Sequence, residues 1–190
     1  WPGARLQTDN ILWKPPGARP LGFHQDSSYL QWMTPSDMMS CWIALDPTTE
    51  ESGTMLLVRG SHKWAQSPMA RQFHGPEDFM SEMYAAAAKE GVEPELVPVE
   101  VPRGGGAFHH GWVWHGSGFN RSQGPRRTHV VHTISSETRY AANRIGEGTG
   151  RIYGRYKRFA DDAMDESYFP ILWTEDGRRT PFLDGYMRGD

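Results

Sequence analysis

Glycine and proline interrupt this chain so often that long helices are excluded over most of its length. The sequence holds 21 Gly and 14 Pro among 190 residues. Glycine supplies the backbone freedom that turns need, while proline removes a backbone donor and disrupts the interior of helices. The stretches between these residues are short and mix apolar with polar positions. This pattern predicts a turn-rich β protein.

The apolar runs between the turns predict a series of short strands. Alternation of apolar and polar residues is typical of a strand with one buried face. The polar sequence PTTEES, between the second and third of these runs, resembles a hairpin loop. We expect strands at 6–14, 38–46, 53–61 and 126–135, with shorter β runs inside 95–118.

One helix interrupts the strands, and the C-terminal part of the chain differs in character. Residues 75–91 predict a helix, because Pro76 suits a first turn, acidic residues follow it and Gly91 suits a stop. Beyond Arg139 the sequence is polar and irregular, with a possible short helix at 161–169. Many short strands with one inserted helix favour a mainly β sandwich or jelly roll over a parallel α/β sheet.

Charge and cysteine content exclude several classes of function. The formal charge of −3 offers no attraction for nucleic acid or an anionic membrane, so we expect neither partner. No apolar run reaches the roughly 20 residues of a membrane helix. Cys41 is the only cysteine, which excludes an internal disulfide and an all-cysteine zinc site and fits a cytoplasmic protein. The start, WPGARLQTDN, lacks the features of a secretory leader.

The tripeptide His24-Gln25-Asp26 is the first candidate for chemistry. Residues two apart on a strand share a face, so an imidazole and a carboxylate can converge on one ion. Two histidines and one carboxylate on one face of an octahedral ion leave three positions open, which suits a non-haem Fe(II) oxygenase. An isolated His-x-Asp is more often a surface pair or a loop, so this interpretation requires a third ligand.

Among the other histidines, His115 has the most informative setting. It ends the aromatic run WVWH and precedes a Gly-Ser-Gly turn, which lets the backbone approach a ligand closely. Strand positions one or three apart face opposite ways, so neither 109 with 110 nor 129 with 132 can share a metal. We interpret six histidines as structural or surface residues: His62, His74, His109, His110, His129 and His132.

Arg126 follows His115 by eleven residues and opens an apolar strand. A buried guanidinium without an anion is very costly, so Arg126 needs a carboxylate from the protein or from a ligand. A structural salt bridge and a bound carboxylate are both open at this point.

Four separated motifs occur in order along the chain: FHQD, Trp42, ESGTMLLVRGSHKW, and WHGSGFN followed by Arg126. Together they closely resemble the phytanoyl-CoA dioxygenase family of Fe(II)- and 2-oxoglutarate-dependent oxygenases. Arg59 stands where the family usually has proline. The resemblance covers about residues 6–135. It implies a double-stranded β-helix, the cupin-like form of the jelly roll, with a partly helical, irregular C-terminal segment.

The resemblance also assigns site residues. His24, Asp26 and His115 match the family's iron ligands. Arg126 matches the residue that pairs with the distal carboxylate of 2-oxoglutarate, and Ser117 matches a hydroxyl that assists it. The remaining matches concern the cosubstrate pocket: Gln25 and Trp42 would line it, and Asn10 would help to hold the other end of 2-oxoglutarate.

A single oxygenase domain over 1–190 follows from the same resemblance, with its core at 6–135 and an extension at 136–190. Family members usually carry a much longer segment before the first iron ligand, which here has 23 residues before it. We therefore expect that the domain lacks its N-terminal part and that a longer chain is the competent enzyme.

The implied function is that of an Fe(II)- and 2-oxoglutarate-dependent dioxygenase. It would use O₂ to hydroxylate or otherwise oxidise an unactivated C–H bond of a small-molecule substrate, with release of succinate and CO₂. Asp26 favours this reaction over halogenation, because related halogenases carry a small residue instead of the carboxylate. The alternatives are a non-catalytic jelly-roll protein that binds a metal or ligand, and a site for another divalent metal. Core packing is favoured over a pocket wall for Tyr29, Trp32, Trp112 and Trp114.

Overall fold

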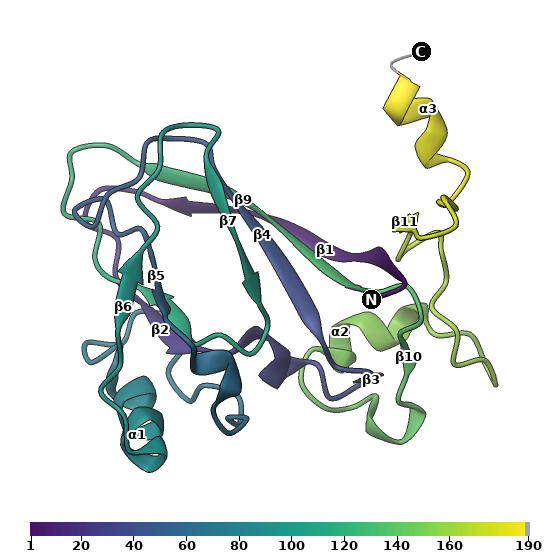
Figure 1. The fold of residues 1–190 in the computed structure, drawn as a ribbon, viewed down its shortest axis with the longest axis horizontal. Coiled ribbons are helices and arrows are strands. Elements are labelled where there is room, and N and C mark those ends of the chain that lie inside the picture. Colours follow the sequence, from purple (N-terminus) through teal and green to yellow (C-terminus); the bar gives the residue numbers. More distant parts are fainter. Residues whose placement is uncertain (189–190) are drawn as a thin grey trace.

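Two antiparallel sheets face each other and form the body of the protein (Figure 1). The computed structural model describes residues 1–188, with side chains up to residue 186. The larger sheet has the order β11-β1-β9-β4-β7, with bounds Ile171–Thr174, Gly3–Lys14, Arg126–Ser135, Met38–Ala44 and Gly106–His110. The smaller sheet has the order β2-β8-β5-β6, with bounds Leu21–His24, His115–Ser117, Met55–Val58 and Leu96–Pro98. This architecture confirms the predicted mainly β jelly-roll class.

The remaining elements are short. Strands β3 (Met33–Thr34) and β10 (Arg139–Tyr140) form a separate antiparallel pair. The α-helices are α1 (Ser81–Glu90), α2 (Gly150–Tyr153) and α3 (Leu183–Arg188). The 3₁₀ turns are η1 (Asp26–Tyr29), η2 (Ser61–Lys63), η3 (Ala142–Arg144) and η4 (Gly154–Tyr156). Among the described residues, no helix has the length and apolar character needed to cross a membrane.

Three local predictions were wrong. The loop 47–52 does not close a hairpin, because β4 pairs with β7 and β9 while β5 pairs with β6 and β8, so this loop carries the chain from one sheet to the other. The helix predicted from residue 75 begins only at Ser81, although it ends at Gly91 in a left-handed conformation as expected. Residues 161–169 form turns and an isolated bridge instead of a short helix.

Alternation along the small sheet separates a structural face from a functional one. Phe23 and Trp114 point outward and pack with Met83 of α1 in one apolar cluster. Their neighbours His24 and His115 therefore face the larger sheet, since successive side chains of a strand lie on opposite faces. Because Phe23 and Trp114 are buried under helix α1 on the outer face of the small sheet, His24 and His115 must point to its inner face.

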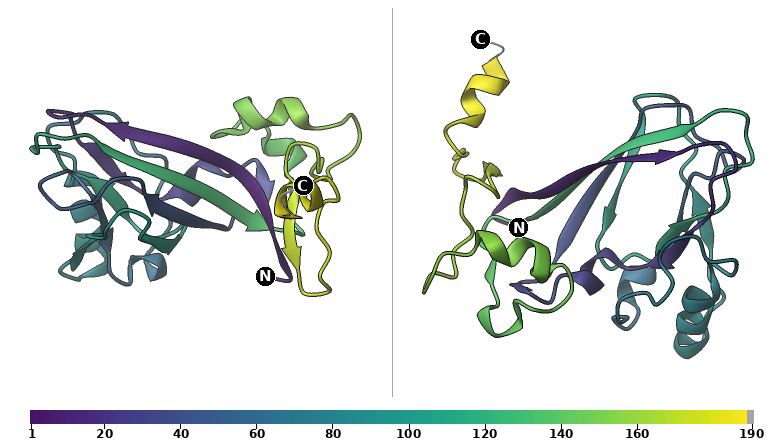
Figure 2. Two further views of the ribbon diagram at one scale, coloured as in Figure 1. Left: turned by 90° about the horizontal axis from the view of Figure 1, so that it is seen from above. Right: turned by 180° about the vertical axis from the view of Figure 1, so that it is seen from behind.

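The C-terminal segment covers one end of the larger sheet, as the views in Figure 2 show. Its residues Tyr140, Met164 and Phe169 share an apolar cluster with Trp32 and Ile134, all nearly inaccessible to solvent. The cluster confirms that Trp32 belongs to the core. It also brings α2 beside the turn η1, and so close to the site described below.

Candidate functional site

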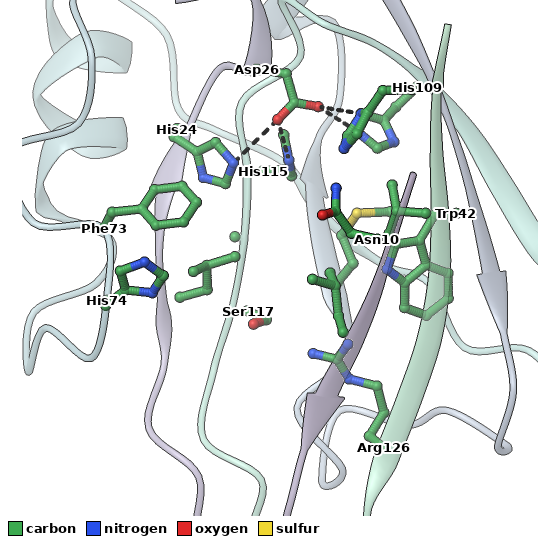
Figure 3. A pocket seen from close by; sticks show the side chains of 16 residues that line it. Asn10, His24, Asp26, Trp42, Phe73, His74, His109, His115, Ser117 and Arg126 are labelled. Carbon is green, nitrogen blue, oxygen red and sulfur yellow. Dashed lines mark hydrogen bonds and ion pairs between the residues drawn. The ribbon is translucent and has the colours of Figure 1, made fainter. Parts of the chain in front are cut away.

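His24, Asp26 and His115 converge between the two sheets (Figure 3). His24 lies directly opposite His115 in the β2–β8 pairing. The backbone of Gln25 is extended, so Asp26 at the start of η1 returns to the side of His24. Oδ1 of Asp26 lies 3.4 Å from Nε2 of His24 and 3.6 Å from Nε2 of His115. The structure thus brings together the three residues that the sequence singled out.

Hydrogen bonds orient the two imidazoles. Nδ1 of His24 lies 2.8 Å from the carbonyl oxygen of Gly22, and Nδ1 of His115 lies 3.0 Å from that of Val113. A carbonyl only accepts, so each Nδ1 carries a proton, and Nε2 of the neutral ring presents a lone pair. Burial lowers the pKa of His115 to about 3, which keeps this ring neutral at physiological pH. Lone pairs of two imidazoles and a carboxylate oxygen therefore face one point, an arrangement that a cation would stabilise.

The second oxygen of Asp26 is held by a separate group of side chains. Oδ2 accepts a hydrogen bond from Ser40 Oγ at 3.0 Å and lies 3.3 Å from Nε2 of His109. Ser40 Oγ also lies 2.8 Å from Nδ1 of His132. The hydroxyl has one proton and the ionised carboxylate has none, so His132 donates to Ser40 and Ser40 donates to Asp26.

The surroundings of Asp26 keep its carboxylate ionised. Burial alone would favour the neutral acid, but the side chains around it, which include the hydrogen-bond partners of Oδ2, hold its pKa well below the usual value. The side chain is only 13% exposed, so a metal bound here would meet a preformed negative charge largely shielded from water.

His109 and His132, which the sequence led us to interpret as structural or surface residues, lie beside Asp26. Alternation correctly excluded a shared metal for each histidine pair, since His129 points outward to Asp9 at 2.9 Å while His132 points inward. One member of each pair, His109 or His132, nevertheless points towards Asp26. Ser40 lies opposite both inward members in the sheet register, so β7, β4 and β9 present their three side chains in one row.

We refer to His24, Asp26 and His115 as the metal triad. A cavity of about 320 Å³ extends from this triad along the inner face of the larger sheet. Arg126 and Ser117 lie at its far end, and Trp42 and Asn10 lie along its wall (Figure 3). His74 also lines it, although the sequence suggested a structural or exposed residue. The predicted cosubstrate residues therefore meet in one cavity, with the exception of Gln25.

Gln25 has a structural role instead of lining the cavity. Its side chain is inaccessible to solvent, donates from Nε2 to the carbonyl of Trp112 at 2.8 Å, and accepts from the backbone N–H of Ser67 at 2.8 Å. Ser27 N–H also donates to the carbonyl of Gly111 at 3.0 Å. A Cβ on Gly111 would lie 2.3 Å from Ser27 Oγ, so glycine is needed where this loop packs against η1. These contacts fix the position of Asp26.

Arg126 is buried without an acidic partner among the described residues. It is 5% exposed, and none of the ion pairs among the described residues includes it. Its guanidinium donates to Thr128 Oγ1 at 3.2 Å and to the carbonyl of Gly53 at 3.0 Å, and Nε has no partner. Burial lowers its pKa to about 10, which still leaves a full positive charge. Of the two alternatives left open by the sequence, a salt bridge within the described residues is therefore excluded.

Lys14 is a second buried cation that the sequence did not reveal. It lies opposite Arg126 in the β1–β9 register, is 7% exposed and donates to Ser117 Oγ at 2.8 Å. Burial and the neighbouring charge of Arg126 lower its pKa to about 7. In the sequence, Lys14 follows Leu12 by two residues and Asn10 by four, which places all three on one face of a strand. This spacing was the only signal that Lys14 could face the cavity. Arg126 lines the end of the cavity, and Lys14 reaches the same end through its hydrogen bond to Ser117. Neither has a carboxylate partner among the described residues, and this arrangement indicates a site for an anion.

Loss of the Ser40 hydroxyl should weaken metal binding. In Ser40→Ala, Oδ2 of Asp26 loses a donor and His132 loses its acceptor, so the carboxylate is less firmly oriented. We expect the affinity for Co(II) or Zn(II) to fall about 10- to 100-fold, as is usual for hydrogen-bond partners of metal ligands. Competition with a fluorescent chelator measures this. Thr133→Val is the matched control, because this hydroxyl bonds the Met39 carbonyl at 2.9 Å and lies next to His132 on the strand. Equal metal affinities for Ser40→Ala and the wild type would contradict this role.

Comparison with known proteins identifies one family. The profile of phytanoyl-CoA dioxygenase (PhyH) matches residues 2–128. Phytanoyl-CoA dioxygenase domain-containing protein 1 of Danio rerio is 29% identical over 115 residues, covering 60% of this chain and 39% of that protein. A probable alpha-ketoglutarate-dependent hypophosphite dioxygenase of Stutzerimonas stutzeri is 31% identical over 128 residues, covering 65% and 42%. The chain thus spans only about two fifths of the length of these curated relatives.

Solved structures share the same architecture. The non-heme alpha ketoglutarate dependent epimerase SnoN from nogalamycin biosynthesis superposes with a TM-score of 0.63 at 19% identity, covering 90% of this chain and 63% of that chain. At this identity the likeness concerns the fold. The non-heme monooxygenase ThoJ superposes with a TM-score of 0.54 at 26% identity, covering 72% and 48%.

Proposed function

This chain belongs to the phytanoyl-CoA dioxygenase family, and we propose that it is an Fe(II)- and 2-oxoglutarate-dependent dioxygenase. It would hydroxylate, or otherwise oxidise, an unactivated C–H bond in a small molecule. The observation that carries the proposal is the convergence of two imidazole lone pairs and one carboxylate oxygen, beside a cavity that ends at Arg126, a cation without an acidic partner among the described residues.

His24, Asp26 and His115 would hold the iron. Two imidazoles and one carboxylate form the facial donor set of non-haem Fe(II) oxygenases, which leaves positions for other ligands. The buried and ionised state of Asp26 fits a dication, and the Nδ1 hydrogen bonds of both histidines direct Nε2 to the metal. The carboxylate also favours hydroxylation over halogenation, since no protein ligand is missing from the set.

Arg126 and Ser117 would bind the distal carboxylate of 2-oxoglutarate. A guanidinium matches a carboxylate with two parallel hydrogen bonds, and burial strengthens them. Lys14 already donates to Ser117 Oγ, so the proton of the Ser117 hydroxyl is free to point at the ligand. Trp42 lies with its ring 5.9 Å from the Arg126 guanidinium and steadies it from the side.

The side chains between these two ends position the cosubstrate and exclude water. Met55, Val130 and Trp42 are among the residues that line the cavity. Asn10 projects an amide from β1 towards the metal end (Figure 3). When bound, iron with 2-oxoglutarate and O₂ would supply the oxidising chemistry that yields succinate and CO₂ and attacks the C–H bond. The contribution of this chain is orientation and a largely apolar enclosure around the reacting groups.

Anaerobic titration of the protein with Fe(II) and 2-oxoglutarate tests the proposal. A visible charge-transfer absorption that needs both components is expected, followed by succinate release when O₂ is admitted. A non-catalytic binding protein would bind the metal or the dicarboxylate without forming succinate. A site for another divalent metal would give no absorption that depends on 2-oxoglutarate. Either of these results in a folded protein would overturn the proposed function.

Lys14 should make the binding of 2-oxoglutarate dependent on pH. Its pKa of about 7 in the empty cavity means that it loses its proton as the pH rises above 7. A bound carboxylate favours the protonated form, so binding above this pH takes up a proton and the affinity falls, by at most about tenfold per pH unit. Below pH 7 the cation is already present and the dependence disappears.

Calorimetry with the metal-loaded protein in buffers of different ionisation enthalpy measures this proton uptake. At about pH 8 we expect uptake approaching one proton per 2-oxoglutarate for the wild type and for the exposed control Lys89→Met. Lys14→Met should bind the cosubstrate more weakly and without proton uptake. Identical uptake by Lys14→Met and the wild type would show that another group titrates.

A further inference from the structure

The metal triad borders a second cavity, on the side away from Arg126. It has a volume of about 280 Å³ and shares five residues with the first cavity: Asn10, His24, Asp26, Phe73 and His132. Its remaining walls come from β1, the turn η1, the start of β4 and helix α2 with its preceding residue. A molecule placed here would lie against the metal ligands without occupying the space that ends at Arg126.

A β-bulge directs Gln7 into this second cavity. In the β1–β9 ladder Leu6 pairs with Thr133 and Thr8 pairs with His132, so Gln7 has no residue opposite it. Such bulges are common beside active sites, where they re-aim a side chain. Gln7 lines the cavity, is only 5% exposed, and its Nε2 has no hydrogen-bond partner among the described residues. A buried amide without a partner is costly, and an oxygen acceptor on a ligand would satisfy it.

Aromatic rings form the other walls. Tyr29 and Phe73 meet edge to face with their centroids 5.9 Å apart, and both line the cavity. Tyr153 of α2 also lines the cavity. Its ring stacks on that of Trp32, with the two centroids 5.5 Å apart, and this contact holds it in place. Rigid ring surfaces of this kind favour a flat or ring-shaped ligand.

The charge of the lining restricts the ligand further. Apart from Asp26, which faces the metal position, the described residues that line this cavity include no acidic side chain and no lysine or arginine. A carboxylate or phosphate would lose its hydration here without gaining a cationic partner. The volume of about 280 Å³ is also slightly below the roughly 300–1,000 Å³ usual for ligand pockets, which argues against a whole acyl-CoA.

We propose that this second cavity takes the primary substrate, and that the substrate is an uncharged, ring-containing molecule with an oxygen acceptor bound by Gln7. The inference rests on the proposed function, because that function places the metal and 2-oxoglutarate beside the cavity. Gln7 then sets the orientation of the ring, while Tyr29, Phe73 and Tyr153 select for its shape.

Saturation-transfer NMR on the protein loaded with Zn(II) and excess 2-oxoglutarate tests the inference. Zn(II) is a diamagnetic stand-in for iron, and the excess cosubstrate blocks the cation end of the first cavity. The probes are matched pairs: 4-chromanone with 4-oxochromane-2-carboxylate, and methyl 2-naphthoate with 2-naphthoate. We expect the neutral member of each pair to bind at least about tenfold more tightly than its carboxylate.

Substitutions then localise the binding. Gln7→Leu should weaken the neutral probes about three- to tenfold through loss of one hydrogen bond, and Tyr153→Ala should weaken them through loss of ring contact. Gln123→Leu removes an exposed amide remote from the cavity and should change nothing. Retained 2-oxoglutarate binding shows that each variant is folded.

Three results would overturn the inference: no binding of either neutral probe, equal binding of neutral and charged probes, or unchanged binding by both cavity variants. If the wild type bound Zn(II) but not 2-oxoglutarate, the proposed function would fail instead, which separates the two outcomes.

Discussion

Replacement of Asp26 by alanine is expected to abolish succinate formation and to remove high-affinity Fe(II) binding. The substitution leaves two neutral imidazoles and takes away the negative charge that offsets the dication. It also leaves Ser40 and His109 without the carboxylate oxygen that they contact. The loss in affinity should exceed the roughly 10- to 100-fold caused by removing a hydrogen-bond partner of a ligand. Anaerobic calorimetry with Fe(II) and an assay for succinate measure the two effects.

Asp9→Ala is the matched control for this prediction. Asp9 is a carboxylate of the same part of the chain, but it points outward from β1 to His129 at 2.9 Å and is largely exposed. Exposed pairs of this kind contribute little to stability. Asp9→Ala should therefore bind Fe(II) and release succinate like the wild type. An Asp26→Ala protein with unchanged Fe(II) affinity and turnover would remove Asp26 from the site.

Arg126→Leu should cause the second-largest effect, a loss of 2-oxoglutarate affinity of about 100-fold or more with metal binding retained. Removing one partner of a buried charge pair commonly costs this much, because the other charge loses its hydration without compensation. Calorimetric titration of the metal-loaded variant with 2-oxoglutarate measures the loss. Arg126→Lys should restore part of the affinity, since it returns the charge without the planar fork of donors.

The neighbouring arginine provides the control. Arg127 faces the opposite side of β9 and pairs with Asp46 at 2.6 Å near the surface. Arg127→Leu removes the same charge from the same strand, so it should leave 2-oxoglutarate affinity unchanged. If both arginine variants weakened binding equally, the effect would reflect the net charge of the protein instead of a contact within the cavity.

Local sequence patterns predicted the strand at 126–135 better than the start of the helix. The strand predicted at 126–135 is observed as Arg126–Ser135, because its alternation of apolar and polar residues is continuous. The helix expected from Pro76 begins at Ser81, because the backbone carbonyl of Phe79 accepts a hydrogen bond from Phe23 N–H. The segment before Ser81 therefore runs beside β2. That contact joins residues far apart in the sequence, and no local signal predicts it.

The same distinction applies to the site. Motifs within short stretches identified His24, Asp26 and His115, and spacing from His115 identified Arg126. The partners of Asp26 depend on register across three strands, so His109 and His132 were interpreted as structural or surface residues. Lys14 was missed for a similar reason, since only the β1–β9 pairing places it opposite Arg126. Gln25 was assigned to the cavity, but loop packing directs its amide to the backbone.

The class of fold, the family resemblance and the candidate set of metal donors follow from the sequence alone, because each depends on residue type, periodicity and short spacing. Three other features become visible in the folded protein: which histidines lie around Asp26, how Lys14 reaches Ser117, and that Gln7 enters a second cavity. These features depend on sheet register, a β-bulge and the docking of the C-terminal segment. They result from contacts between residues distant in the chain, where burial and strand pairing override local pattern.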